Sequence, residues 1–375
     1  MIRILTVMLR LTKWSIKTVL LLTGILPFFK FGSGYKEKDG KITFNGREIT
    51  DKNFIVLNDE FAKDSTAAYY KERAFSYADV PSFQALDEHY AKDKNKVYYC
   101  DEYREGQNYY LTKKQTILEV KNAVPASFEI LKSGYAKDNL HAYFQGNAFK
   151  VKDLSTLEVV NISFVKDGVQ AYLNCEPIIG SDGKTFEVIN ASYAKDTAHI
   201  YFYGYTGKEK KNVYTIPGNR ASFVVLDYPY SKDNAKVFYE GWEISGANAS
   251  TFKVMGNGYA KDDAVVYFGL KKVAGADAAS FELYKEGDST LESLNYARDK
   301  NFVFLDDKKI NDADVSTFRV LTLGYSSDSE HVFYKTSIIK DADPASFKTY
   351  QHGYGDADAE DAKKKYLAGK KVVVE

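Results

Sequence analysis

Residues 93–100, DKNKVYYC, run from a charged turn straight into a short stretch that is apolar or aromatic on both faces. Asp93 opens the stretch, and Tyr98 follows five residues later. The same spacing recurs along the chain, and the aromatic residues at the fifth position are Tyr69, Tyr98, Tyr143, Tyr172, Tyr201, Phe238, Tyr267, Phe304 and Phe333. Successive side chains of a strand point to opposite faces, so this pattern predicts a short strand that is covered on both sides.

Two further markers share one period. An aromatic residue stands three positions before each Asp or its equivalent, at Phe61, Tyr90, Tyr135, Phe164, Tyr193, Tyr230, Tyr259, Tyr296 and Tyr325, and Tyr354 continues the series. The gaps between them are 29, 45, 29, 29, 37, 29, 37, 29 and 29 residues. A second anchor lies seven residues before the next aromatic, at Phe83, Phe128, Leu157, Phe186, Phe223, Phe252, Phe318 and Phe347. Two markers with one period indicate tandem repeats.

One unit reads as a β-hairpin followed by a segment that carries the Phe anchor. The segments GADAASF (275–281) and DADPASF (341–347) are typical of a turn or short helical turn before the Phe. An earlier hairpin with an Asn-Gly turn is expected at 39–49. We expect the Phe anchors in the core and the Lys-Asp turns on the surface.

The predicted fold is all-β, with tandem β-hairpin repeats of about 29 residues stacked as an open twisted solenoid. A closed, propeller-like ring is the alternative. Four-stranded propeller blades are disfavoured, because they take about 40–45 residues. The array is expected to cover residues 35–375, as about ten units with a half unit at the C-terminus.

Three additions interrupt the period. Residues 101–119 and 205–214 are expected to lengthen hairpins, whereas 282–295 follow a Phe anchor. Removal of residues 104–119 is expected to leave a folded protein, because it restores the 29-residue spacing. Additions free of the packing constraint are where a scaffold can place recognition.

Residues 1–34 differ in kind from the repeats. Arg3, Arg10, Lys13 and Lys17 precede an apolar run from Val19 to Phe29, and the first acidic residue is Glu37. This pattern predicts a secretory signal peptide or an N-terminal membrane anchor formed by residues 14–29. The expected location is therefore the periplasm or the cell surface, with the membrane contacted through this segment.

The charge balance excludes one class of partner. Lys plus Arg equals Asp plus Glu at 51 each, so no basic field is present to attract nucleic acid. Aromatic residues make up 15% of the chain, with 30 Tyr and only 7 Pro, which favours half-buried strands. Cys100 and Cys175 fall on opposite faces by their repeat positions, and a disulfide between them is not expected.

The repeat resembles the DKNYY repeat family of bacterial proteins, through stretches such as DKNKVYY at 93–99 and across residues 35–375. Ser326-Ser327 in place of Ala-Lys, and Leu157 in place of Phe, depart from the repeat. The resemblance implies an exported or envelope-associated repeat protein and supplies no catalytic residues.

Neither a metal nor a cofactor is predicted. A recurring Asp is expected to accept backbone N–H bonds in its own turn and not to bind calcium. The Asp262-Asp263 pair and the cluster Asp356, Asp358, Glu360 and Asp361 are the exceptions to test. His141, His199 and His331 share one repeat position, but their units are not neighbours, so we expect solvated strand entries.

The tyrosine anchors predict a buried ladder whose hydroxyls find hydrogen bonds at the edge of the core. The candidate binding residues are Tyr103, Tyr109, Tyr110, Tyr203 and Trp242, which lie in the additions or beside turn glycines. The sequence thus favours a scaffold that binds a protein partner, or alternatively a glycan through exposed aromatics. We do not expect an enzyme, because no set of polar residues is singled out to converge in a pocket.

Overall fold

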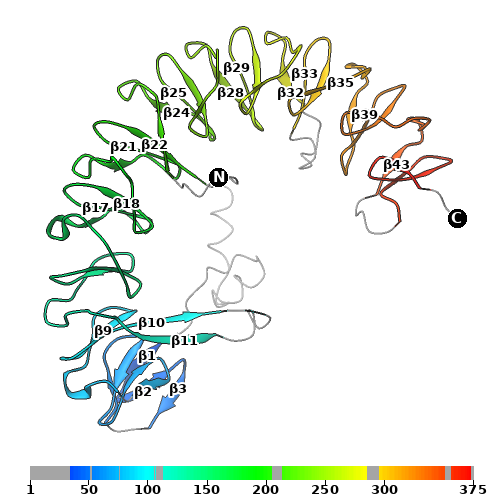
Figure 1. Cartoon of the computed structure of the whole chain (residues 1–375). Coiled ribbons are helices and arrows are strands. Elements are labelled where there is room, and N and C mark those ends of the chain that lie inside the picture. The colour runs from blue at the N-terminus through cyan, green and yellow to red at the C-terminus, as the bar shows by residue number, and fades with distance from the viewer. Residues whose placement is uncertain are drawn as a thin grey trace, which may run out of the picture. The chain divides into compact units, whose positions relative to one another are not determined.

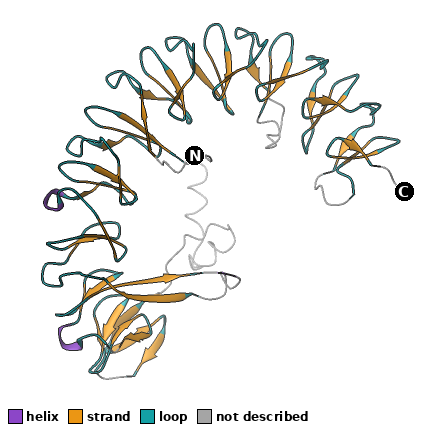
Figure 2. Ribbon diagram, in the orientation of Figure 1, coloured by secondary structure: helices purple, strands orange, loops and turns teal. Residues whose placement is uncertain are grey.

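The computed structural model describes residues 34–50, 53–75, 77–104, 106, 113–204, 213–284, 295–350 and 356–372. The chain divides into two compact units, Met1–Pro177 and Ile178–Glu375. In each unit short strands form a series of small antiparallel sheets (Figures 1 and 2). The all-β prediction is confirmed, and no sheet of the described part closes into a barrel.

The first unit holds sheets A to E. Their strands are β1 (Tyr35–Lys38), β2 (Lys41–Phe44) and β3 (Arg47–Ile49) in sheet A; β4 (Ile55–Val56), β5 (Phe61–Lys63), β6 (Ala68–Tyr70) and β7 (Arg73–Phe75) in B; β8 (Gln84–Ala85), β9 (Tyr90–Lys92), β10 (Val97–Tyr103) and β11 (Lys114–Glu119) in C; β12 (Glu129–Ile130), β13 (Tyr135–Lys137), β14 (Ala142–Phe144) and β15 (Asn147–Phe149) in D; and β16 (Glu158–Val159), β17 (Phe164–Lys166), β18 (Ala171–Leu173) and β19 (Glu176–Pro177) in E. The 3-10 turns η1 (Val80–Ser82) and η3 (Leu154–Thr156) precede the anchors Phe83 and Leu157, as the sequence predicts.

The second unit holds sheets F to K. Their strands are β20 (Glu187–Val188), β21 (Tyr193–Lys195), β22 (Ile200–Tyr203) and β23 (Val213–Ile216) in F; β24 (Val224–Val225), β25 (Tyr230–Lys232), β26 (Val237–Tyr239) and β27 (Trp242–Glu243) in G; β28 (Lys253–Gly256), β29 (Tyr259–Lys261), β30 (Val266–Phe268) and β31 (Lys271–Lys272) in H; β32 (Glu282–Leu283), β33 (Tyr296–Arg298), β34 (Val303–Leu305) and β35 (Lys308–Ile310) in I; β36 (Arg319–Val320), β37 (Tyr325–Ser327), β38 (Val332–Tyr334) and β39 (Ser337–Ile338) in J; and β40 (Lys348–Thr349), β41 (Ala359–Glu360), β42 (Lys365–Leu367) and β43 (Lys370–Lys371) in K.

Each repeat is a four-stranded meander and not only a hairpin. The two residues after the Phe anchor form a first strand, and the aromatic anchor opens the second. The prediction that 29 residues are too few for four strands was wrong. Most strands have only two to four residues, so four of them fit into one repeat of 29 residues. Counted from the first strand, the incomplete unit is the three-stranded sheet A, whereas sheet K has all four strands.

The hydrophobic core lies between adjacent sheets. Phe252 precedes sheet H and packs between Tyr230 of sheet G and Tyr267 of its own sheet, with ring centroids 5.6 and 5.8 Å away. The corresponding cluster of sheets C and D joins Tyr90, Phe128 and Tyr143. The prediction that the Phe anchors are core is confirmed. Since each sheet buries its apolar faces against its neighbours, no single repeat has a core of its own.

The recurring Asp is buried and joins two parts of its repeat, contrary to the expected surface position. The Oδ1 of Asp93 accepts the N–H groups of Asn95 and Lys96 at 2.7 and 2.8 Å, which is the predicted turn. Its Oδ2 also accepts the N–H of Asp79 at 2.8 Å and the hydroxyl of Tyr98 at 2.7 Å. Burial disfavours the charged carboxylate, but the bonds from Tyr98 and these N–H groups hold the pKa of Asp93 below its ordinary value.

The Lys before the Asp is not free on the surface either. Lys261 Nζ donates to the carbonyls of Ala278 and Phe281, at 2.7 and 3.1 Å, in the segment that leads into sheet I. Lys92 and Lys232 make the same kind of bond to the following repeat. The ammonium groups therefore bridge neighbouring repeats.

The tyrosine ladder is confirmed, and the hydroxyls of Tyr90 and Tyr230 form hydrogen bonds with the next sheet. The Tyr230 hydroxyl donates to the Gly258 carbonyl at 2.6 Å and accepts the N–H of Gly269 at 3.1 Å. Tyr90 makes the equivalent pair with Gly134 and Gly146. Sheet K departs from the series: Asp358 occupies the aromatic position that was assigned to Tyr354, and it accepts the Tyr325 hydroxyl at 2.6 Å. Tyr354 itself lies outside the described residues.

The first addition lengthens a hairpin as predicted. Strands β10 and β11 pair over six positions, from Tyr98 opposite Glu119 to Tyr103 opposite Lys114 (Figure 1). Residues 104–119 contain β11, the last strand of sheet C, so their removal takes a strand from that sheet; that the shortened chain folds stays a prediction. Ile117 of that strand packs against the core shared by sheets B and C.

The predicted signal peptide or anchor, residues 1–34, lies outside the described residues apart from Gly34, and it stays a prediction. Within the described ranges, no helix has the length and apolar character that a membrane crossing requires.

Candidate functional site

Trp242 is the most prominent predicted binding residue that the structure describes. It opens the edge strand β27, and its side chain is 51% exposed. Its ring centroid lies 5.9 Å from that of Tyr214 on β23 of the neighbouring sheet, with the two planes tilted by 51°. The sequence analysis missed Tyr214, because it stands at the end of an addition and not at an anchor.

The backbone under Trp242 is held in place. The preceding Gly241 has φ +80, and a Cβ at this position would come within 2.8 Å of the Phe202 Cβ in sheet F. Glycine is therefore required both by the left-handed conformation and by the close approach of the two sheets. The turn thus fixes the place of the indole ring beside sheet F.

The other predicted residues have settings of their own. Tyr203 ends β22, is half-buried and donates its hydroxyl to the Asn190 carbonyl. Tyr103 is 40% exposed at the far end of the β10 ladder. Tyr109 and Tyr110 lie outside the described residues.

The long hairpin that carries Tyr103 is fastened to sheet B. Glu102 Oε2 lies 3.0 Å from Lys71 Nζ, and the same carboxylate contacts Lys113 across the hairpin. Burial raises the pKa of Glu102, but the hydrogen bonds and charges of the two lysines outweigh it and leave the pKa below the ordinary value. Arg73 Nη1 also donates to the Gln115 carbonyl at 2.5 Å. The base of the hairpin is thus a fixed support for its exposed end.

The histidines singled out from the sequence lie beside the Asp of their own turn, and Asp263 binds residues of the segment before its sheet. The Nδ1 atoms of His141, His199 and His331 lie 3.5–3.8 Å from the Asp carboxylate of the same turn. Asp263 accepts hydrogen bonds from Thr251 and Asn248. Across the ranges that the structure describes, no three His, Cys, Asp or Glu side chains gather in a way that could hold a metal ion.

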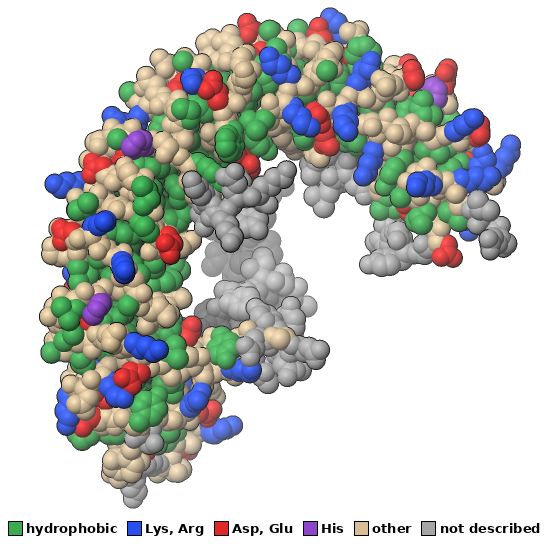
Figure 3. Space-filling model, viewed as in Figure 1, with side chains coloured by type: hydrophobic (Ala, Val, Ile, Leu, Met, Phe, Trp, Pro, Cys, Tyr) green, Lys and Arg blue, Asp and Glu red, His purple; other side chains and the backbone are tan. Residues whose placement is uncertain are grey.

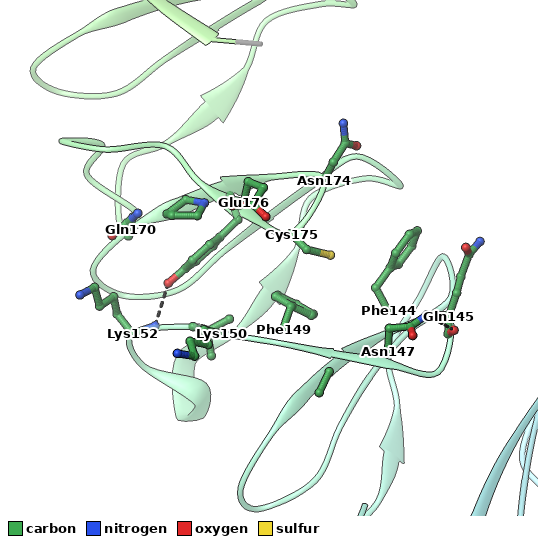
Figure 4. Close-up of a pocket in the computed structure, with 14 residues that line it drawn as sticks. Phe144, Gln145, Asn147, Phe149, Lys150, Lys152, Gln170, Asn174, Cys175 and Glu176 are labelled. Carbon is green, nitrogen blue, oxygen red and sulfur yellow. Dashed lines mark hydrogen bonds between the residues drawn. The ribbon is translucent and has the colours of Figure 1, made fainter. Parts of the chain in front are cut away.

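A groove of about 730 Å³ lies between sheets D and E of the first unit (Figure 4). Phe144 and Asn147 lie at one end, Phe149 and Cys175 in the middle, and Gln170 and Lys152 at the other end. Cys100 and Cys175 are both free thiols, in agreement with the expectation of no disulfide. Burial raises the pKa of the Cys175 thiol, although a hydrogen bond from Tyr135 acts in the opposite direction.

Antiparallel sheets that pack on their neighbours within each unit, with tyrosine hydroxyls and lysine ammonium groups bonded to the following sheet, define the class: an all-β tandem-repeat protein. The model of the DKNYY family matches residues 12–102, 103–218, 202–267, 259–321 and 306–371. The chain therefore belongs to the DKNYY family, and the resemblance seen in its repeats is confirmed. No curated protein and no solved structure matches the chain.

Proposed function

We propose that the protein is an exported or envelope-tethered repeat scaffold that binds a protein partner through its repeat surface and inserted hairpins. The proposal assigns it no catalytic step. Export is supported by the cationic and then apolar residues 1–29.

The observation that carries the proposal is the half-exposed indole of Trp242 beside Tyr214. Large aromatic side chains dominate the energetics of protein interfaces, above all where their conformation is fixed before binding. The close packing of Gly241 on sheet F supplies that preorganisation. Charged groups of both signs are interspersed with apolar ones on the visible face (Figure 3), a composition suited to a protein interface.

A glycan is the alternative ligand for the same pair of rings. Sugar rings stack on flat aromatic faces, however, and a tilt of 51° between Tyr214 and Trp242 does not form a flat platform. The tilted pair of rings therefore favours the protein partner.

The test is site-specific photo-crosslinking in cells that naturally produce the protein. A benzophenone amino acid replaces Trp242 in one variant and Tyr228 in a matched control; Tyr228 is 63% exposed in the same repeat. We expect a discrete protein adduct from position 242 that is absent from position 228, with its identity given by mass spectrometry. Equal adducts at both positions would contradict the proposal. Binding of the purified protein to a glycan array that is lost in Trp242→Ala would support the alternative.

A further inference from the structure

Sheet E brings together three residues, each at a position that varies between repeats, along one groove. The turn between the last two strands has Asn174 and Cys175, with φ 50 and 67, where sheets A, D, G and K have a glycine second. Pro177 follows on the edge strand β19, and Gln170 precedes β18. All three residues lie in the lining of the groove between sheets D and E.

The cysteine explains why the groove exists. A Cβ at the turn glycines Gly146 and Gly241 would come within 2.7 and 2.8 Å of the aromatic residue in the preceding sheet. Cys175 occupies the same turn position and has a Cβ, so sheet E cannot approach Phe144 of sheet D as closely. The space that a glycine would have closed remains open, with the thiol lying between Phe149 and Phe144 (Figure 4).

The proline explains why Gln170 has an unused donor. In sheets C and G the same two positions hold Lys and Glu, which form ion pairs: Lys96 with Glu119 at 2.6 Å and Lys236 with Glu243 at 2.7 Å. In sheet E the register places Pro177 opposite Tyr172, where the acidic residue would stand. Gln170 is only 9% exposed, and its Nε2 is buried without a hydrogen-bond partner. A buried donor without an acceptor costs free energy. A ligand that places an acceptor in this groove therefore recovers the hydrogen bond that the folded chain does not make.

The charges of the lining define the kind of acceptor. Lys150 and Lys152 lie at the same end as Gln170, Glu176 adds one negative charge on β19, and the middle is apolar. We propose that the groove between sheets D and E binds an amphipathic carboxylic acid, whose carboxylate accepts from Gln170 Nε2 beside the two lysines and whose apolar body covers Phe149, Cys175 and Phe144. A volume of about 730 Å³ is within the range of small-molecule sites. This inference is independent of the proposed protein partner.

Binding is tested by calorimetric titration of the full chain with laurate below its micellar concentration. Dodecanol and dodecylamine are the matched probes that lack the carboxylate. We expect laurate to bind at least about tenfold more tightly than either probe, and to slow the alkylation of Cys175 by N-ethylmaleimide. Failure of laurate to bind, or equal binding of the three probes, would overturn the proposal.

Three variants separate the groove from a general apolar surface. Cys175→Gly should close the groove, abolish laurate binding and raise the urea midpoint of unfolding, because glycine suits φ 67. Cys175→Ala keeps the Cβ and should bind laurate within about twofold of the natural chain. Pro177→Glu should give Gln170 an acceptor, repel the carboxylate and weaken binding at least about tenfold. Unchanged affinity in Cys175→Gly would show that laurate binds elsewhere, and all three variants are checked for folding by circular dichroism.

Discussion

Replacement of Asp262 by Ala is expected to cost about 3–5 kcal/mol of the unfolding free energy, although the position reads as a surface turn. The Oδ1 of Asp262 accepts the N–H groups of Ala264 and Val265, at 2.9 and 2.7 Å. Its Oδ2 accepts the N–H of Asn248 at 3.0 Å and the hydroxyl of Tyr267 at 2.9 Å. A hydrogen bond to a charged group contributes about 1.5–3 kcal/mol, and the turn donors can regain water, so the four contributions do not simply add.

The neighbouring Asp263 is the matched control. It is exposed and accepts hydrogen bonds from Thr251 and Asn248 at the surface. Asp263→Ala should therefore lower the unfolding free energy far less than Asp262→Ala does. Asp262→Asn keeps the shape and the turn but places an N–H group toward Asn248, and should fall between the two at about 1–2 kcal/mol.

Urea unfolding followed by far-UV circular dichroism measures the cost, and amide hydrogen exchange of residues 253–272 locates it. We expect the exchange of sheet H to accelerate first in Asp262→Ala, since this Asp joins sheet H to the segment before it. Equal costs for Asp262→Ala and Asp263→Ala would refute the account of the buried aspartate.

Three other outcomes are expected. Turn aspartates such as Asp93 and Asp262 have folded-state pKa values below the ordinary one, so the unfolded chain takes up protons first as the pH falls. The urea midpoint of unfolding should therefore be constant from pH 7 to about 5 and fall as the pH drops below about 4. A midpoint that rises on acidification would contradict this. A reporter fused after Gly34 should be active on the far side of the membrane, and activity confined to the cytoplasm would end the export proposal. Replacement of residues 104–113 by Asn-Gly should leave a folded protein, because it retains Val120 and the strand pairing from Tyr98 to Tyr103. Deletion of residues 104–119 removes β11 and should expose the amides of sheet C to rapid hydrogen exchange. Equal folding of the two variants would show that β11 is not needed.

The repeat period and the two anchors could be predicted from the sequence, because packing between sheets demands a large apolar side chain at fixed intervals. The first strand of each sheet could not. Strands such as Glu129–Ile130 have two residues, which is too short for an alternating pattern to be recognised. The burial of Asp262 was also missed. A charged residue in a Lys-Asp turn is expected to be solvated, and the sequence alone does not show that the Tyr267 hydroxyl donates to its carboxylate.

The candidate sites were less predictable than the fold. Trp242 was predicted because it stands next to a turn glycine, but Tyr214 was hidden in an addition. The groove residues Gln170, Cys175 and Pro177 stand at three separate positions that vary between repeats. Their common location appears only when the register of sheet E brings them together.

The central claim, that recognition resides in the fixed aromatic pair on the repeat surface, is tested most directly by one affinity measurement. The partner identified by crosslinking at position 242 is titrated against the natural chain, Trp242→Ala and the control Tyr228→Ala. The account predicts at least about tenfold weaker binding for Trp242→Ala, a loss of about 1.4 kcal/mol or more, and no change for Tyr228→Ala. Unchanged affinity in Trp242→Ala, with the variant folded, would contradict it.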